Sequence, residues 1–253
     1  MSRRQTALVV EGGAMRGIFA AGVLDAFLAK GRTAFDHCIG VSAGAVNLAA
    51  FLAGQQGRNH NVITDYSCRP EFINLAKFLR GGHWLDLDWL WAITIRECRL
   101  DLARFAAELE QQIKASCSVP LVYRDFVRID GEAMTDGGVA DSIPVRHAYE
   151  QGARDITVVL SRPLGYRKRA PRLPALHRYL LRKTPALARA SLSRHQSYND
   201  AIDFIRQPPA DCRIRVIVPP AGFRVGRMTT DRGRLEQGYQ MGWQAALDYL
   251  GSA

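Results

Sequence analysis

The pattern G-x-S-x-G at residues 40–44 constrains the fold of this chain more than any other stretch. A short apolar run suited to a buried strand precedes it, and residues 43–52 are apolar on nearly every face, which predicts a helix buried all round. Gly40 and Gly44 then flank a serine on a tight, strained turn between strand and helix. Such a turn exposes the Ser42 hydroxyl beside the positive end of a helix, where developing negative charge is stabilised.

A second glycine turn lies upstream. Residues 6–11 suit a buried strand, residues 12–17 read Gly-Gly-Ala-Met-Arg-Gly, and residues 18–28 have the apolar spacing of a helix. Two successive strand–turn–helix units predict a parallel sheet with right-handed crossovers. Backbone N–H groups at such a turn bind anions, either a phosphate or the oxyanion of an acyl-transfer intermediate. The Walker pattern is absent and Ala14 breaks the dinucleotide pattern, so the oxyanion is favoured.

A third motif, Asp-Gly-Gly, occupies residues 136–138. Taken alone it is as consistent with a simple hairpin turn as with a functional carboxylate. The six histidines are scattered and lack the spacing of metal ligands, so neither a metal nor another cofactor is expected. Three of the four tryptophans fall within residues 84–91 and either pack in the core or face a substrate.

The composition indicates one globular domain over residues 1–253. The hydrophobic fraction is 47% and the charged fraction 23%. No apolar run approaches the roughly 18 residues that a membrane-spanning helix needs. The first residues lead directly into a predicted strand, so we expect no signal peptide. Five cysteines without a C-x-x-C pair favour reduced thiols and a cytoplasmic protein.

The positive charge is concentrated in one basic segment, residues 161–199. This segment contains ten Lys or Arg and no Asp or Glu, whereas the whole chain has 34 basic and 24 acidic residues. The remainder is therefore balanced at 24 of each, and the segment carries the whole net charge of +10. Four prolines interrupt it, which fits a solvated loop. The alternative is a surface for an anionic partner such as phospholipid, phosphate or nucleic acid.

The three motifs in this order resemble the patatin-like phospholipase family, and within it the bacterial branch. The resemblance extends well over residues 6–54 and 115–170. It implies a three-layer α/β sandwich with a mostly parallel sheet. A strand that family members carry upstream of residue 115 has no counterpart here, because the helix predicted over residues 100–114 runs straight into that point. The predicted sheet is therefore one strand short of the family pattern.

The resemblance also implies a Ser–Asp dyad without histidine. Ser42 would be the nucleophile and Asp136 the general base. The oxyanion hole would be formed at Gly12, Gly13 and Ala14, with Arg16 supporting the charge. Gly137 and Gly138 complete the Asp-Gly-Gly motif. Family members usually carry glycine at position 14, and alanine can replace it there if that residue does not need a positive φ.

The predicted function is a serine lipid acyl hydrolase that acts on phospholipid or another acyl ester, with peripheral contact to anionic membrane at its cytoplasmic face. One alternative is a Ser-Asp-His triad that uses His147, His177 or His195. Another is a catalytically impaired member that only binds anionic lipid. Nucleic-acid binding is less favoured, because the basic segment contains few aromatic residues and no nucleic-acid-binding motif.

Overall fold

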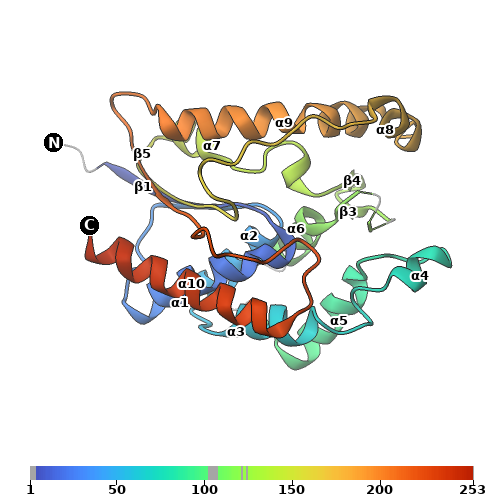
Figure 1. Cartoon of the computed structure of the whole chain (residues 1–253), viewed down its shortest axis with the longest axis horizontal. Helices are drawn as coiled ribbons and strands as arrows, with labels where there is room; N and C mark the ends of the chain where they lie inside the picture. Colours follow the sequence, from blue (N-terminus) through green and yellow to red (C-terminus); the bar gives the residue numbers. More distant parts are fainter. Residues whose placement is uncertain (1–3, 102–107, 121, 124, 253) are drawn as a thin grey trace.

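The computed structural model describes residues 4–101, 108–120, 122–123 and 125–252. Its centre is a parallel sheet with the strand order β2-β1-β5-β6 (Figure 1). The strands are β1 (Gln5–Val10), β2 (His37–Gly40), β5 (Ala153–Val159) and β6 (Arg213–Ile217). The predicted α/β class with a mostly parallel sheet is confirmed.

Helices cover both faces of this sheet, which makes three layers. Ala7 and Val9 of β1 pack against α7 (Val145–Glu150) and α9 (Pro185–Arg206). Leu8 and Val10 face the opposite layer, because successive side chains of a strand point to opposite sides. That layer contains α1 (Gly17–Ala29), α2 (Ala43–Leu52) and α10 (Arg232–Gly251).

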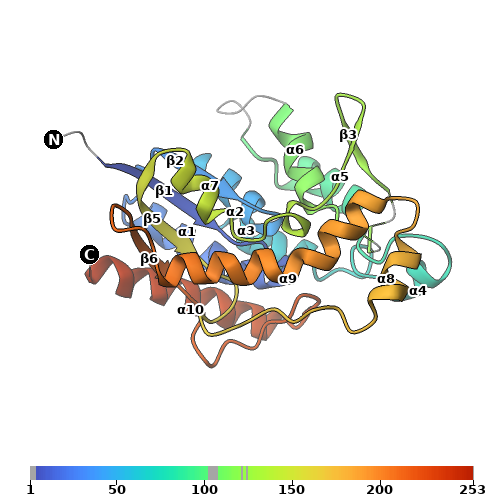
Figure 2. The same cartoon turned by 90° about the horizontal axis from the view of Figure 1, so that it is seen from above.

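The remaining elements lie mainly beyond the β2 edge and at one end of the sheet (Figure 2). They are η1 (Ala14–Arg16), α3 (Arg58–Asn61), η2 (Val62–Tyr66), α4 (Leu75–Leu79), α5 (Leu87–Glu97), α6 (Glu108–Cys117), the β3 (Val127–Ile129) and β4 (Glu132–Met134) hairpin, η4 (Gly137–Val139) and α8 (Pro174–Leu180). The helix predicted over residues 100–114 falls partly on residues 102–107, outside the described residues. Of its described residues, 108–114 belong to α6 and 100–101 are not helical. The described residues between α5 and β3 add no strand to the main sheet.

Helices α1 and α10 approach each other closely. A Cβ added to Gly22 would lie 2.1 Å from the Tyr239 carbonyl oxygen, and one added to Gly242 would lie 2.0 Å from the Phe19 carbonyl oxygen. Neither distance is compatible with a side chain larger than hydrogen. The two backbones therefore pack in direct contact, and this contact joins the first helix of the chain to the last.

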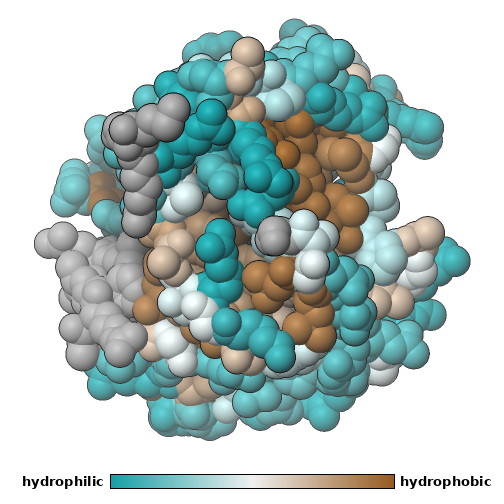
Figure 3. All heavy atoms as spheres, turned by 90° about the vertical axis from the view of Figure 1, so that its left-hand side faces the viewer, coloured by the Kyte–Doolittle hydropathy of each residue, from teal (hydrophilic) through white to brown (hydrophobic). Residues whose placement is uncertain are grey.

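The basic segment is largely helical, in α8 and the first part of α9, rather than a loop. Helices α4 and α8 lie at the same end of the molecule (Figures 1 and 2). Six of the nine large hydrophobic side chains that the described residues expose lie on α4 or at α8: Leu75, Leu79, Leu173, Leu176, Tyr179 and Leu180. The opposite end, which carries both termini, shows hydrophobic side chains between broad hydrophilic areas (Figure 3). Among the described residues, no helix is long and apolar enough to cross a membrane.

Candidate active site

The turn between β2 and α2 places Ser42 in a strained conformation, with φ 54° and ψ −126°. Its glycines are required by close backbone contacts. A Cβ at Gly44 would lie 2.4 Å from the Val10 carbonyl oxygen, and a Cβ at Gly40 would lie 2.7 Å from the Ala45 nitrogen. A non-glycine residue at positive φ costs of order 1–3 kcal/mol and persists only where the surroundings enforce it. Ser42 thus lies on a tight turn between strand and helix, next to glycines that have no room for a side chain.

Asp136 lies between strand β4 and η4, and its side chain is almost fully buried. Its Oδ1 accepts a 2.8 Å hydrogen bond from the Gly138 N–H, and its own N–H donates to the Ser118 carbonyl at 3.0 Å. A Cβ at Gly138 would lie 2.8 Å from that carboxylate oxygen, whereas one at Gly137 would be 3.4 Å from the nearest atom, Ser116 Oγ. Gly138 is therefore needed to hold the carboxylate, and Gly137 is less constrained.

The electrostatics of Asp136 suit a proton acceptor. Burial raises its pKa above the ordinary value of 3.8. The nearby Ser42 hydroxyl, the positive charge of Arg194, the Gly138 N–H and the charge of Arg227 oppose this rise in part. A carboxylate with a raised pKa and a hydroxyl partner is a group of the kind used in general-base catalysis.

The glycine turn meets the elbow at its backbone. A Cβ at Gly12 would lie 2.7 Å from the Val41 carbonyl oxygen. The Met15 and Arg16 N–H groups donate to the carbonyls of Arg227 and Gly13, at 3.4 and 3.2 Å. The N–H groups of Gly13 and Ala14 have no acceptor in the part of the chain that the structure describes. Those two donors therefore remain available for an anion.

Ala14 has φ 50°, so the residue that replaces the usual glycine adopts the left-handed region. Position 14 therefore needs a positive φ, which is the condition under which alanine is a poor replacement. Alanine retains the N–H group but is strained there by about 1–2 kcal/mol. The glycine turn therefore retains the N–H groups of Gly13 and Ala14, but the strain at Ala14 destabilises the fold.

Arg16 is turned away from the pockets at Ser42. It is buried, and its Nη2 and Nε donate to Ser161 Oγ at 3.1 and 3.3 Å. The Ser161 N–H donates to Glu11 Oε2 at 2.6 Å. Burial lowers the pKa of Arg16 to about 10 and raises that of Glu11, and each charge opposes the shift of the other. Arg16 thus ties the glycine turn to the end of β5 and lines neither pocket at Ser42.

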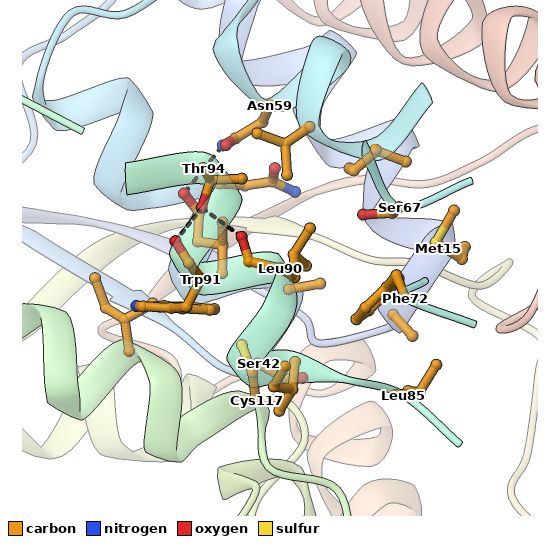
Figure 4. A pocket seen from close by; sticks show the side chains of 18 of the residues that line it. Met15, Ser42, Asn59, Ser67, Phe72, Leu85, Leu90, Trp91, Thr94 and Cys117 are labelled. Carbon is orange, nitrogen blue, oxygen red and sulfur yellow. Dashed lines mark hydrogen bonds between the residues drawn. The ribbon is translucent and has the colours of Figure 1, made fainter. Parts of the chain in front are cut away.

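Two pockets meet where five residues line both of them: Ala14, Ser42, Leu85, Val119 and Arg227. One, of about 140 Å³, is lined mainly by apolar side chains from α2, η2, α5 and α6 (Figure 4). The other, of about 220 Å³, is more polar and contains Asp136, the glycine turn and two arginines. Trp91 borders the first and Trp84 the second, so two of the clustered tryptophans face cavities. The Cys117 thiol also borders the apolar pocket, and burial raises its pKa.

The arginines of the polar pocket, Arg194 and Arg227, were not singled out by the sequence motifs. Arg194 was one of ten basic residues in the segment 161–199, and nothing in the local sequence distinguished Arg227. The three candidate histidines line neither pocket: His147 is exposed on α7, His177 pairs with Ser191 Oγ at 2.8 Å, and His195 lies 2.9 Å from the Leu192 carbonyl. Among the described residues, no cluster of His, Cys, Asp or Glu could hold a metal ion.

Comparisons with known proteins agree with this geometry. Residues 8–108 and 99–149 match the family model described as patatin-like phospholipase, and residues 184–252 match a domain of unknown function, DUF6363. Uncharacterized protein YjjU of Escherichia coli (strain K12) is 33% identical over 265 residues, which covers 93% of this chain and 74% of the relative. The chain therefore belongs to the patatin-like phospholipase family.

Proposed function

We propose that this protein is a serine lipid acyl hydrolase that uses a Ser42–Asp136 dyad. The observation that carries the proposal is the position of Ser42, on a strained elbow where an apolar pocket meets a polar pocket containing Asp136. An ester bound with its acyl chain in the apolar pocket would present its carbonyl to the Ser42 hydroxyl, with the alcohol part in the polar pocket.

In the proposed mechanism, Ser42 Oγ attacks the ester carbonyl while Asp136 accepts the hydroxyl proton. The resulting oxyanion is stabilised by the N–H groups of Gly13 and Ala14 and by the N-terminal end of α2. Asp136 then returns the proton to the departing alcohol, which leaves an acyl group on Ser42. A water molecule, deprotonated by Asp136, hydrolyses this acyl-enzyme and regenerates both side chains. Arg16 contributes by holding the glycine turn in place.

The exposed hydrophobic residues at α4 and α8, together with the exposed basic residues around them, support a second part of the proposal. We infer that this end of the molecule docks on the anionic, cytoplasmic face of a membrane, where a lipid acyl hydrolase meets its substrate. Arg167 and Lys168 are excluded from this surface: Arg167 forms a salt bridge with Asp203, and Lys168 is half-buried near Ser142.

The mechanism is tested by hydrolysis of a soluble short-chain chromogenic ester. Ser42→Ala and Asp136→Asn should each lower kcat/KM by about 100-fold or more, since loss of a nucleophile or base removes at least that factor. Alanine at His147, His177 or His195, one at a time, should leave the rate within about tenfold. A collapse in one histidine variant would favour the triad. If neither the parent protein nor Ser42→Ala hydrolyses the ester above background, an impaired, lipid-binding member is favoured.

A further inference from the structure

The polar pocket has two arginines from the C-terminal part of the chain. Arg194 comes from α9 and Arg227 from the loop between β6 and α10. A Cβ at Gly138 would lie 3.1 Å from Arg194 Nη2, so this guanidinium rests against the turn that holds Asp136. The Arg227 carbonyl accepts the Met15 N–H, which fixes the Arg227 backbone to the glycine turn. Both arginines are thus held beside the reacting groups.

Arg194 interacts electrostatically with the carboxylates of Asp136 and Glu11, and Arg227 is exposed. In the part of the chain that the structure describes, neither arginine forms a salt bridge, and the buried Nε of Arg194 has no hydrogen-bond partner. A buried guanidinium donor without a partner is costly, and of the three that the described residues contain, on Arg16, Arg194 and Arg215, only that of Arg194 belongs to a residue that lines the polar pocket, where an anionic ligand could supply the acceptor. Arg194 therefore points to an anionic ligand in this pocket.

The pocket is positive overall. Asp136 is its one carboxylate among the lining residues, against the two arginines. Lys168 adds a third basic group next to the lining, since its Nζ donates to Ser142 Oγ at 3.3 Å. Burial, followed by the charges of Arg194 and Arg227, lowers the Lys168 pKa to about 7. Burial is the larger cause of this shift, and the two arginines add to it because they lie close enough to Lys168 to disfavour its charged form.

We propose that Arg194 and Arg227 bind a phosphate group on the alcohol side of the substrate. This inference rests on the proposed function, which places the alcohol part in the polar pocket. Arginine presents paired donors that match phosphate oxygens. A phosphate monoester, as in phosphatidic acid, would bind better than a phosphodiester whose head group carries a quaternary ammonium. In the second case a further positive charge would face the two guanidinium groups. The substrate class is therefore acyl esters of glycerol phosphate with an anionic head group.

The test compares two soluble substrates with the same acyl chains, dihexanoyl phosphatidic acid and dihexanoyl glycerol, below their aggregation concentrations so that membrane docking plays no part. The parent protein should prefer the phosphate-bearing ester. Arg194→Gln and Arg227→Gln should each lower kcat/KM for that ester by about 10- to 100-fold, mainly through KM, because a hydrogen bond to a charged group is lost. The loss on the neutral ester should be clearly smaller, so that the preference for the phosphate-bearing ester decreases in both variants.

The matched control is Arg224→Gln. Arg224 is an exposed arginine of the same loop that lines neither pocket, so its removal should change neither rate. Arg194→Lys, which retains the charge, should recover part of the loss. Because Arg227 is exposed, its variant should fold even if Arg194→Gln does not.

A second arm uses inorganic phosphate to distinguish the lipid phosphate from a free anion. Phosphate should compete with the phosphate-bearing ester in the parent protein and compete more weakly in Arg227→Gln. Binding of dihexanoyl phosphatidic acid to Ser42→Ala protein, measured by calorimetry, should be weakened by the same substitution, and this readout does not depend on hydrolysis. Equal losses on both esters, or phosphate binding without any preference for the phosphate-bearing ester, would overturn the proposal. Absence of hydrolysis with retained, arginine-dependent binding would instead contradict the proposed function.

Discussion

The region that matches the patatin model, residues 8–149, and the region that matches DUF6363, residues 184–252, contribute to the site in different ways. The first supplies Ser42, Asp136 and the glycine turn, each beside a glycine at which an added Cβ would lie within 3 Å of another atom. The second supplies Arg194 and Arg227, two side chains that the fold brings to the same pocket. The proposed reacting groups therefore lie in one family region, while the charges proposed to select a substrate come from the other.

The two regions share one core. Strand β6 pairs with β5 in the central sheet, α10 packs on α1, and α9 covers the face opposite to α1. We propose that residues 1–253 fold as a single unit and that neither region forms its core alone. Each prediction below changes one region and measures the consequence for the other.

The largest effect is expected for Gly242→Ala. Its added Cβ would lie 2.0 Å from the Phe19 carbonyl oxygen, so α10 would have to move off α1. We expect a loss of about 4 kcal/mol or more in the free energy of unfolding, above the usual range for overpacking because the obstacle is backbone. Gly251→Ala, on the same helix with no atom near the new Cβ, is the control. Urea denaturation measures both. An unchanged transition for Gly242→Ala would mean that the two regions are not coupled at this contact.

Docking on a membrane should depend on the exposed basic residues around α8, and it should not depend on ester hydrolysis at Ser42. We consider a variant with glutamine at six exposed positions: Arg169, Arg172, Arg178, Arg182, Lys183 and Arg189. If half of these residues contact an anionic surface, at about 1 kcal/mol each, vesicle binding should weaken by roughly 100-fold. Hydrolysis of a soluble ester should be retained, and binding of the parent protein should decrease as salt rises. Salt-independent binding would exclude electrostatic docking.

The pH dependence of kcat/KM should report the pKa of Asp136 and the effect of Arg194 and Arg227 on it. Asp136 must be deprotonated to accept the Ser42 proton, and burial raises its pKa, so the acid limb of kcat/KM should lie above pH 3.8. Activity on a neutral soluble ester should decrease about tenfold per pH unit below that limb. Arg194 and Arg227 lower this pKa, so Arg194→Gln and Arg227→Gln should move the limb to higher pH, whereas Arg224→Gln should not. A limb that moves to lower pH would contradict the assignment of Asp136 as the base.

The smallest effect is expected at the turn. Ala14→Gly should relieve the positive φ of residue 14 and stabilise the fold by about 1 kcal/mol, since left-handed backbone costs alanine about that much. Thermal melting, with Ala53→Gly as the comparison at a negative φ, measures the difference. If Ala14→Gly destabilises the protein as much as Ala53→Gly does, the turn is not strained.

The parts of this account that the sequence predicted are those encoded locally. The strand before Ser42, the apolar helix after it and the glycines around both appear in consecutive residues, because a strained turn restricts each neighbour. The helical state of residues 174–206 was less evident, since prolines suggested a loop; Pro174 and Pro185 instead begin α8 and α9.

The parts that were not predicted depend on tertiary contacts. The direction of Arg16 is determined by Ser161 and Glu11, which lie far apart in the sequence. The positive φ of Ala14 has no counterpart in any residue pattern of the sequence. Arg194 looked like any other basic residue of its segment. Its neighbour across the pocket, Arg227, comes from a loop whose sequence has no motif.

The central claim is that Ser42 is a nucleophile activated by Asp136. Labelling with a fluorophosphonate tests it directly, because Ser42 Oγ would form a bond to phosphorus, fluoride would leave and Asp136 would take the hydroxyl proton. We predict one adduct per chain, located at Ser42 by mass spectrometry, absent from Ser42→Ala and formed about 100-fold or more slowly by Asp136→Asn. An adduct at another residue would contradict this role for Ser42. So would a Ser42→Ala variant that hydrolyses the ester as fast as the parent protein.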